Sequence, residues 1–409
     1  MQKRIFWLGM LLFGLLLTGC VRPWGGEVVD AVPEPLPSFT PVPASAIPSQ
    51  TPTSTATSTT TPTATPTNTP APTATPSRIV QGPAGFPANV NPLTGLTVDD
   101  PTLMDRNPVA IKISNFPRGL RPHSGLSSAD MVFEYYIGVG ATRFTAIFYG
   151  QDIDKAGPIR SARLIDIPLV RAYQGIMGFV SADAYVYERV TNALGGRAIS
   201  QSGQTCPAIC RTGSGDVNSV FSNTAEMTIW ADEYRGITPE KPNLDGMLFD
   251  SEPPTGGETG TQLGVNYSFT TRSEWRYNDE TGLYERWIEQ LDQNNRMSMI
   301  PLIDRNNDEQ VTAANVIVMF SEHIELQPTL HDIPLKDNQS GERGILFRDG
   351  QTYEIRWRSI NPDRPFQFYS PDGNLMALKP GNTFVQIVGL RSTVDSPADG
   401  QTEIVLFLP

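Results

Sequence analysis

The chain has 409 residues and a formal net charge of −12, with 18% of its residues charged. This acidic balance argues against binding to nucleic acid or general adhesion to an anionic membrane surface. Only three cysteines are present, and the two that follow Cys20 have no neighbouring His, which excludes a four-ligand zinc site.

The first twenty residues have the pattern of an export signal. Lys3 and Arg4 precede an apolar run from Ile5 to Leu17, which is shorter than the roughly 20 residues that span a bilayer. Small residues then lead to Cys20, and the ending Leu-Thr-Gly-Cys resembles the bacterial lipobox. Residues 1–20 are therefore predicted to be a lipoprotein signal peptide. We expect an acylated Cys20 to anchor the protein in the lipid bilayer, on the extracytoplasmic face of the cytoplasmic membrane.

Residues 21–87 are predicted to form a disordered tether. Between Pro33 and Ser77 the chain is mostly Pro, Thr, Ser and Ala, with twelve prolines and Glu34 as its only charge. Such a composition cannot build an apolar core. Proline keeps the chain extended, so the tether could reach on the order of 100 Å at about 3.1 Å per residue.

The first part of the body, residues 88–254, is predicted to be an α+β domain with mixed, largely antiparallel sheets and a few helices. Residues 130–137 alternate between two faces, and they are separated from a second strand-like run by Gly138-Val139-Gly140, which predicts an antiparallel hairpin. The strands of this part are predicted at 109–113, 130–137, 143–151 and 176–181, and a short helix at 167–174.

After a predicted linker at 255–261, residues 262–409 are expected to be rich in β-structure. Glycines mark turns at 348–351 and 371–374. The numerous aromatic residues here could stack on sugar rings, but we favour a β core. The strands are predicted at 267–271, 283–288, 315–320, 344–347, 352–357, 383–388 and 403–408.

Cys206 and Cys210 lie four residues apart in a chain that is expected to be exported. Export permits a disulfide, so a small loop-closing bond is favoured over a metal site. A redox-active pair is a third alternative, although the spacing is not Cys-x-x-Cys.

The strongest candidate for a ligand site is an arginine-rich segment just ahead of the predicted helix. Arg160, Ser161 and Arg163 lie there, and Arg143 could converge on them from the hairpin. Arginine binds carboxylate or phosphate in bidentate fashion, which predicts an anion-binding loop. The alternative is structural ion pairing, of Arg163 with Asp166, of Arg143 with Glu134 and of Arg160 with another carboxylate.

His123, which precedes Ser124, is the histidine best placed for chemistry. A catalytic triad converges from distant segments, however, and no hydrolase motif or zinc-protease motif accompanies this pair. His123 is therefore predicted to be a turn residue or a polar contact at a pocket rim. Residues 304–315 fail the pattern of a calcium loop, and no cofactor or metal is expected.

Several segments in this order resemble one known family. They are Asn91-Pro92-Leu93-Thr94-Gly95-Leu96, residues 121–130, Phe133-Glu134, Thr142-Arg143-Phe144, residues 157–163, Asn315-Val316-Ile317-Val318 and Pro380-Gly381-Asn382-Thr383. Together they are similar to the YerB-like lipoproteins, which carry a DUF3048 domain of unknown function. The resemblance implies a two-part α+β lipoprotein and supplies no activity. The family's His-Asn-hydrophobic-Tyr element is replaced here by Phe221-Ser222-Asn223-Thr224.

Three functions remain open from the sequence. The leading one is an envelope lipoprotein that binds an anionic wall component, peptide or small solute through Arg143, Arg160 and Arg163. In this hypothesis Glu134 orients the arginines, and Asn115 and His123 lie at the rim. The second is a hydrolase or transferase of envelope polymers, with Glu134 or Asp130 as general acid or base. The third is a structural, partner-binding envelope protein.

Overall fold

The structure is a computed structural model that describes residues 78–213, 218–336 and 340–408. The predicted signal peptide, Cys20 and the tether up to Ser77 lie outside the described residues. Within these three segments, no helix combines the length and the apolar character that crossing a bilayer requires.

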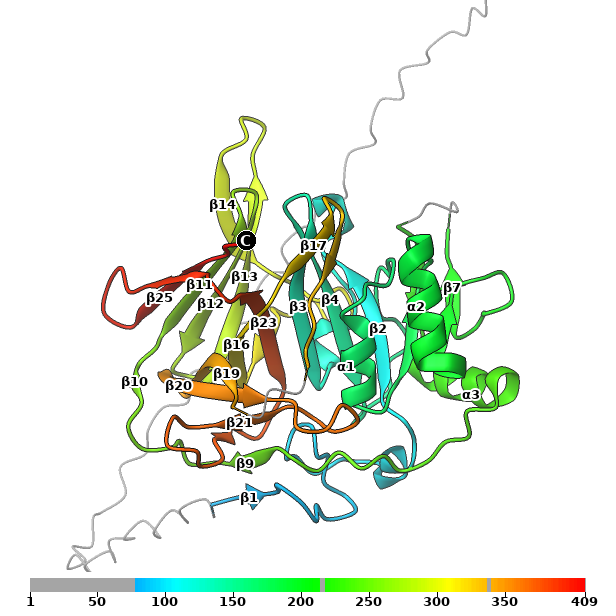
Figure 1. Ribbon diagram of the computed structural model, residues 1–409, viewed down its shortest axis with the longest axis horizontal. Helices are drawn as coiled ribbons and strands as arrows, with labels where there is room; N and C mark the ends of the chain where they lie inside the picture. Colours follow the sequence, from blue (N-terminus) through cyan, green and yellow to red (C-terminus); the bar gives the residue numbers. More distant parts are fainter. Residues whose placement is uncertain (1–77, 214–217, 337–339, 409) are drawn as a thin grey trace, which may run out of the picture. The chain divides into compact units, whose positions relative to one another are not determined.

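A mixed sheet of eleven strands runs through the described body (Figure 1). Its central hairpin pairs with strands from both halves of the chain, in parallel on one side through β23 and antiparallel on the other through β2. In spatial order the strands are β10 (Glu258–Thr259), β20 (Gln351–Arg358), β19 (Glu342–Arg348), β16 (Asn315–Ser321), β23 (Thr383–Gly389), β3 (Met131–Gly138), β4 (Ala141–Phe148), β2 (Val109–Ser114), β5 (Ile176–Phe179) and β6 (Ala198–Ser200), with β21 (Gln367–Tyr369) paired to β20.

A second sheet of seven strands packs against one face of the first. Its strands are β14 (Met297–Pro301), β13 (Leu283–Leu291), β12 (Thr271–Asn278), β11 (Gln262–Ser268), β25 (Gln401–Val405) and β24 (Thr393–Asp395), with β15 (Thr312–Ala313) paired to β13. The smaller sheets are β1 (Val80–Gln81) with β9 (Leu248–Asp250) and β22 (Ala377–Leu378), β17 (Ile324–Gln327) with β18 (Leu330–Asp332), and β7 (Ile209–Arg211) with β8 (Val220–Ser222).

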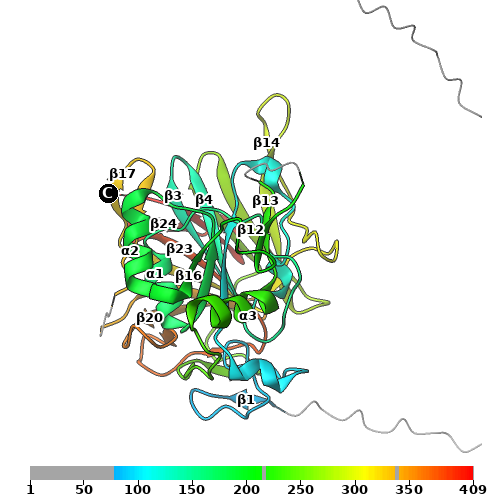
Figure 2. The same ribbon diagram turned by 90° about the vertical axis from the view of Figure 1, so that its right-hand side faces the viewer.

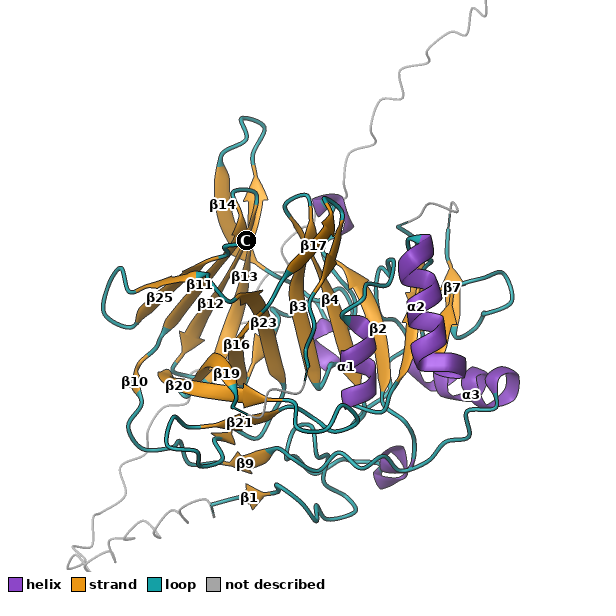
Figure 3. Cartoon of the chain, in the orientation of Figure 1, coloured by secondary structure: helices purple, strands orange, loops and turns teal. Residues whose placement is uncertain are grey.

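The helices lie beside the half of the large sheet that contains β4, β2 and β5 (Figure 3). They are α1 (Asp166–Ala172), α2 (Ala184–Leu194) and α3 (Thr224–Arg235), and the 3-10 turns are η1 (Pro101–Asp105), η2 (Arg118–Leu120), η3 (Leu126–Ser128) and η4 (Gly195–Arg197). In Figure 2, α1 and α2 lie on one side of β3 and β4, with β12 and β13 on the other.

The large sheet separates two hydrophobic cores. Side chains of α1 and α2 pack with Met131, Phe133 and Tyr135 on one face. On the other face Val132 and Phe144 pack with α3 and the seven-stranded sheet. This alternation confirms the two faces predicted for the strand at 130–137, because successive side chains of a strand point to opposite sides.

The β3–β4 hairpin confirms the predicted turn. Val139 and the two glycines around it all have positive φ, a conformation that glycine adopts without strain. The turn after β19 likewise places Asp349 and Gly350 at positive φ, as the sequence indicated. The predicted helix at 167–174 corresponds to α1, with Pro168 in its first turn.

Three boundaries differ from the sequence predictions. Residues 78–87, which composition assigned to the tether, belong to the body: Arg78 forms an ion pair with Asp250, and β1 pairs with β9. The predicted linker at 255–261 contains β10, which pairs with β20. The strand predicted at 267–271 covers the end of β11, the start of β12 and the two-residue turn between them, where Phe269 is 91% exposed.

The two predicted parts of the body are joined through one sheet. Strand β23 pairs in parallel with β3, so that Thr383 lies opposite Met131. No local sequence pattern indicates such a long-range parallel pairing. The boundaries at 254 and 262 stay a prediction, but the sheet crosses them without a break.

Candidate functional site

The register of the β3–β4 hairpin divides the predicted site between the two faces of the large sheet. Arg143 lies opposite Tyr135, whereas Glu134 lies opposite Phe144. Adjacent residues of a strand face opposite sides, so Glu134 and Arg143 cannot meet. The hypothesis that Glu134 orients the arginines is therefore wrong.

On the helix face, a buried ion pair lies beneath the arginines. Lys112 from β2 and Asp166 from α1 are both 0% exposed, and Lys112 Nζ lies 2.9 Å from Asp166 Oδ1. Tyr135 and Thr145 also donate hydroxyl hydrogen bonds to Asp166, at 2.6 and 2.8 Å. Asp166 is thus held by both strands of the hairpin as well as by the lysine.

Arg143 and Arg163 converge on this ion pair from two elements. Arg143 Nη1 donates to Ser161 O at 2.7 Å, and Arg163 Nη1 donates to Thr329 O in the β17–β18 turn. The Nε–H groups of both arginines are buried and have no hydrogen-bond acceptor among the described residues. Each guanidinium therefore contacts a backbone carbonyl and has donors to spare.

Positive charge accumulates around Asp166. Burial, together with the charges of Arg163 and Arg160, lowers the pKa of Arg143 to about 9, against the attraction of Asp166. Burial also lowers the pKa of Lys112 to about 7, against the attraction of Asp166. Burial lowers the pKa of Arg163, and the charges of Asp166 and of Asp183, at the start of α2, partly offset this effect. A partly buried site in which the positive side chains outnumber the carboxylates favours an added anion.

Arg160 lies at the edge of this cluster. Its backbone N–H donates to Lys112 O at 2.9 Å, which ties the arginine-rich segment to β2. Its guanidinium donates to the side chain of Asn218. Arg143, Arg160, Ser161 and Arg163 are thus brought together, as the sequence hypothesis required.

Glu134 and Asn115 belong instead to a polar network between the two sheets. Glu134 Oε2 lies 2.6 Å from Arg286 Nη2 of β13, and both side chains are 0% exposed. Asn115 and Thr142 donate to Glu134 Oε1 at 3.1 and 2.8 Å. With its amide oriented to match, Gln386 bridges the pair by donating to Glu134 and accepting from Arg286. This network is sealed from solvent and cannot meet a substrate.

His123 lies in the same inter-sheet layer and not at a pocket rim. It is 0% exposed, and its ring packs edge-on against Phe144 with centroids 5.4 Å apart. Burial, with Arg121 and Arg286 nearby, lowers its pKa to about 3. A neutral imidazole without solvent access is a poor general base, and the rim hypothesis is wrong.

The burial of His123 predicts an acid-sensitive fold. The unfolded chain takes up a proton on His123 near pH 6.5, whereas the folded chain does so only near pH 3. Its contribution is therefore complete above pH 6.5 and is lost as the pH falls, by up to about 1.4 kcal/mol per pH unit. Urea unfolding at pH 7 and pH 4.5 should show a smaller loss for His123→Phe than for the wild type. Equal losses would contradict this assignment.

Asp130, the other proposed acid or base, is a structural anchor. Its carboxylate accepts hydrogen bonds from the backbone of Tyr149 and Gly150 and, at 2.8 Å, from Asn91 Nδ2. The Asn91-to-Leu96 segment also meets the Pro380-to-Thr383 segment here, since Gly381 N donates to Thr94 O at 2.8 Å. Two segments that carry the family resemblance therefore fasten the start of β3.

The remaining sequence hypotheses have simple outcomes. A disulfide joins Cys206 and Cys210, which frame the start of β7. Trp275, Tyr284 and Trp357 are almost fully buried, which supports a β core for those aromatic residues. Phe221 and Ser222 lie in β8, and Asn223 caps α3 by accepting from Glu226 N.

The sequence analysis missed Lys112 and considered Asp166 only as an ion-pair partner of Arg163, whereas Asp166 pairs with Lys112. A signal for Lys112 was present, because a lysine stands in the middle of the otherwise apolar run Val109–Ile113. A buried lysine needs a partner, and that requirement points to a carboxylate on a packed element. The identity of the partner, 54 residues away, follows only from the fold.

Comparisons with known proteins agree with these features. Residues 93–234 match the N-terminal domain, and residues 263–385 the C-terminal domain, of the family described as protein of unknown function DUF3048. The chain is 29% identical over 301 residues to the Bacillus subtilis (strain 168) protein YerB, provisionally named a lipoprotein, covering 73% of this chain and 85% of that protein.

A crystal structure of YerB from Bacillus subtilis has the same fold. It aligns with a TM-score of 0.60 and 24% sequence identity, and covers 73% of this chain and 96% of that one. At this identity the likeness concerns the fold alone. The two domain matches and the common architecture lead to one conclusion: the chain belongs to the YerB-like DUF3048 family.

Proposed function

We propose that the protein is a lipid-anchored, extracytoplasmic lipoprotein whose body binds an anionic group of a cell-envelope component through Arg143, Arg160 and Arg163. The Leu-Thr-Gly-Cys ending at Cys20 supports the anchor, as does the lipoprotein name of the similar Bacillus subtilis protein. The ligand is a carboxylate or phosphate carried by a wall polymer, a peptide or a small solute.

One observation carries the binding proposal. Arg143 and Arg163 are partly buried close to each other, yet neither forms an ion pair among the described residues, and each has a buried Nε–H without an acceptor. Two like charges held together in a partly desolvated site destabilise each other. An anion between them would remove that repulsion and satisfy the donors.

Thermal unfolding of residues 21–409 in the presence of anions tests this proposal. Phosphate, sulfate and citrate should raise the melting temperature saturably above a sodium chloride control of equal ionic strength. In Arg163→Gln the dissociation constant should rise at least tenfold. Arg163 is the preferred change because its backbone N–H bond to Asp166 remains.

Arg189→Gln is the matched control, because it removes an exposed arginine from α2 outside the cluster. It should respond to anions as the wild type does. Equal anion effects in the wild type and in Arg163→Gln would contradict the proposal. The absence of any saturable shift with these anions and with envelope fragments would leave the arginines with a structural role only.

A further inference from the structure

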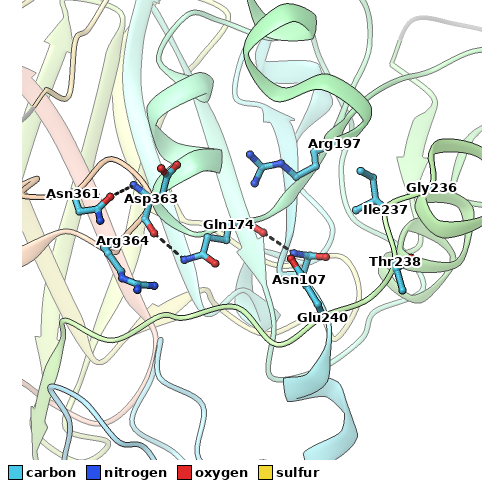
Figure 4. Close-up of a pocket in the computed structure, with 10 residues that line it drawn as sticks. All are labelled: Asn107, Gln174, Arg197, Gly236, Ile237, Thr238, Glu240, Asn361, Asp363 and Arg364. Carbon is cyan, nitrogen blue, oxygen red and sulfur yellow. Dashed lines mark hydrogen bonds between the residues drawn. The ribbon is translucent and has the colours of Figure 1, made fainter.

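A polar pocket of 580 Å³ lies at the other end of α1 from the arginine cluster (Figure 4). Its walls come from five separate places: the chain ahead of β2, the turn after α1, the end of η4, the segment after α3 and the loop between β20 and β21. The polar residues that matter below are Asn107, Gln174, Arg197, Glu240, Asp363 and Arg364.

Gln174 holds these walls in place. It adopts a φ of 51°, which is uncommon for a residue other than glycine. Its Nε2 donates to Asn243 O at 2.7 Å and to Asp363 O at 2.8 Å, and its backbone carbonyl accepts from Asn107 at 3.0 Å. The side chain and the backbone carbonyl of Gln174 thus tie three other segments to the turn after α1, so the pocket is formed before any ligand enters.

Two of the four charged side chains that line the pocket are already paired. Asp363 accepts from Arg171 at 3.0 and 3.1 Å, and Arg364 donates to Asn243 O at 2.8 Å. Arg197 and Glu240 make no hydrogen bond or ion pair with any part of the chain that the structure describes. Half-burial lowers the pKa of Arg197, while the charges of Asp363 and Glu240 raise it.

Arg197 and Glu240 therefore interact electrostatically without forming an ion pair. In Figure 4 the Arg197 guanidinium points toward Gln174, and Glu240 lies near Asn107 on the other side of the opening. The C-terminal end of α3, capped by Gly236, reaches the pocket on the Glu240 side. The carbonyls of a helix C-terminus favour a positive group, as a carboxylate does.

We propose that this pocket binds a small zwitterion, a free amino acid or a short peptide, with its carboxylate on Arg197 and its ammonium group on Glu240. A simple anion would gain from Arg197 but would be repelled by Glu240 and Asp363. A simple cation would be repelled by Arg197 and Arg364. Only a ligand with both charges matches the two lining side chains that have no partner among the described residues, the cation Arg197 and the anion Glu240.

Isothermal titration calorimetry on residues 21–409 tests this inference. The probes are alanine and alanyl-alanine of both chiralities, with N-acetyl-alanine as the carboxylate-only analogue and alanine amide as the ammonium-only analogue. At least one zwitterion should bind saturably, and both single-charge analogues should bind at least tenfold more weakly.

Arg197→Ala and Glu240→Gln should each weaken binding of that zwitterion at least tenfold. Neither side chain holds the fold through a described hydrogen bond, so both variants should keep the wild-type melting temperature. Arg391→Ala and Glu188→Gln, which change exposed side chains elsewhere, should keep the wild-type affinity. The inference is overturned if no zwitterion binds, if N-acetyl-alanine binds equally well, or if both pocket variants retain full affinity.

Discussion

Replacement of Glu134 by alanine is expected to lower the free energy of unfolding by about 3–5 kcal/mol. The change leaves the Arg286 guanidinium buried between the two sheets without its carboxylate, and it removes the acceptor for Asn115 and Thr142. A buried charge without a partner costs far more than the pair contributes when it is complete. Urea unfolding at pH 7 measures the effect.

Two controls separate this effect from a general loss of a carboxylate. Glu354→Ala, which removes an exposed glutamate from β20, should change stability by no more than about 0.5 kcal/mol. The double change Glu134→Leu with Arg286→Met replaces both charges by apolar groups and should recover most of the loss. A loss below about 1 kcal/mol in Glu134→Ala would show that water or another group solvates Arg286.

The contrast between Glu134 and Arg143 shows which features of the fold the sequence could predict and which it could not. The alternation in residues 130–137 and the glycines around Val139 were sufficient to predict a hairpin and its two faces. They did not give the register, which contains an irregularity between Tyr136 and Gly138. A shift of one residue in a strand moves a side chain to the opposite face. The arginine cluster could therefore be predicted, but not the side of the sheet on which Glu134 lies.

Partners that are distant in sequence form the other limit. Glu134 pairs with Arg286, which is 152 residues away and in a different sheet. Local patterns report which side chains are buried, whereas the fold decides which buried charges meet. The pocket around Arg197 has the same origin, because its walls come from segments that span residues 107 to 364.

Asp166→Asn is expected to be the most destabilising single change in the arginine cluster, at about 3 kcal/mol or more at pH 7. The amide keeps an acceptor for Tyr135 and Thr145 but removes the negative charge that faces Lys112. The pKa of Lys112 is already lowered to about 7 by burial, so the folded chain binds this proton less tightly than the unfolded chain. The stability that neutral Lys112 contributes is thus lost as the pH falls from 10.5 toward 7. In the variant this loss continues below pH 7.

Two treatments should rescue Asp166→Asn if the cluster is an anion site. Raising the pH from 7 to 9 should recover stability, because the folded variant already holds Lys112 neutral and the unfolded chain favours the charged lysine less strongly as the pH approaches 10.5. Adding sulfate should raise the melting temperature of the variant more than that of the wild type, because the anion supplies the missing charge. Lys112→Met in the same background should remove the response to pH and leave the response to sulfate, which depends on Arg143 and Arg163. A variant that is as stable as the wild type at pH 7 and indifferent to sulfate would show that the charge of Asp166 does not stabilise Lys112 and the arginines around it.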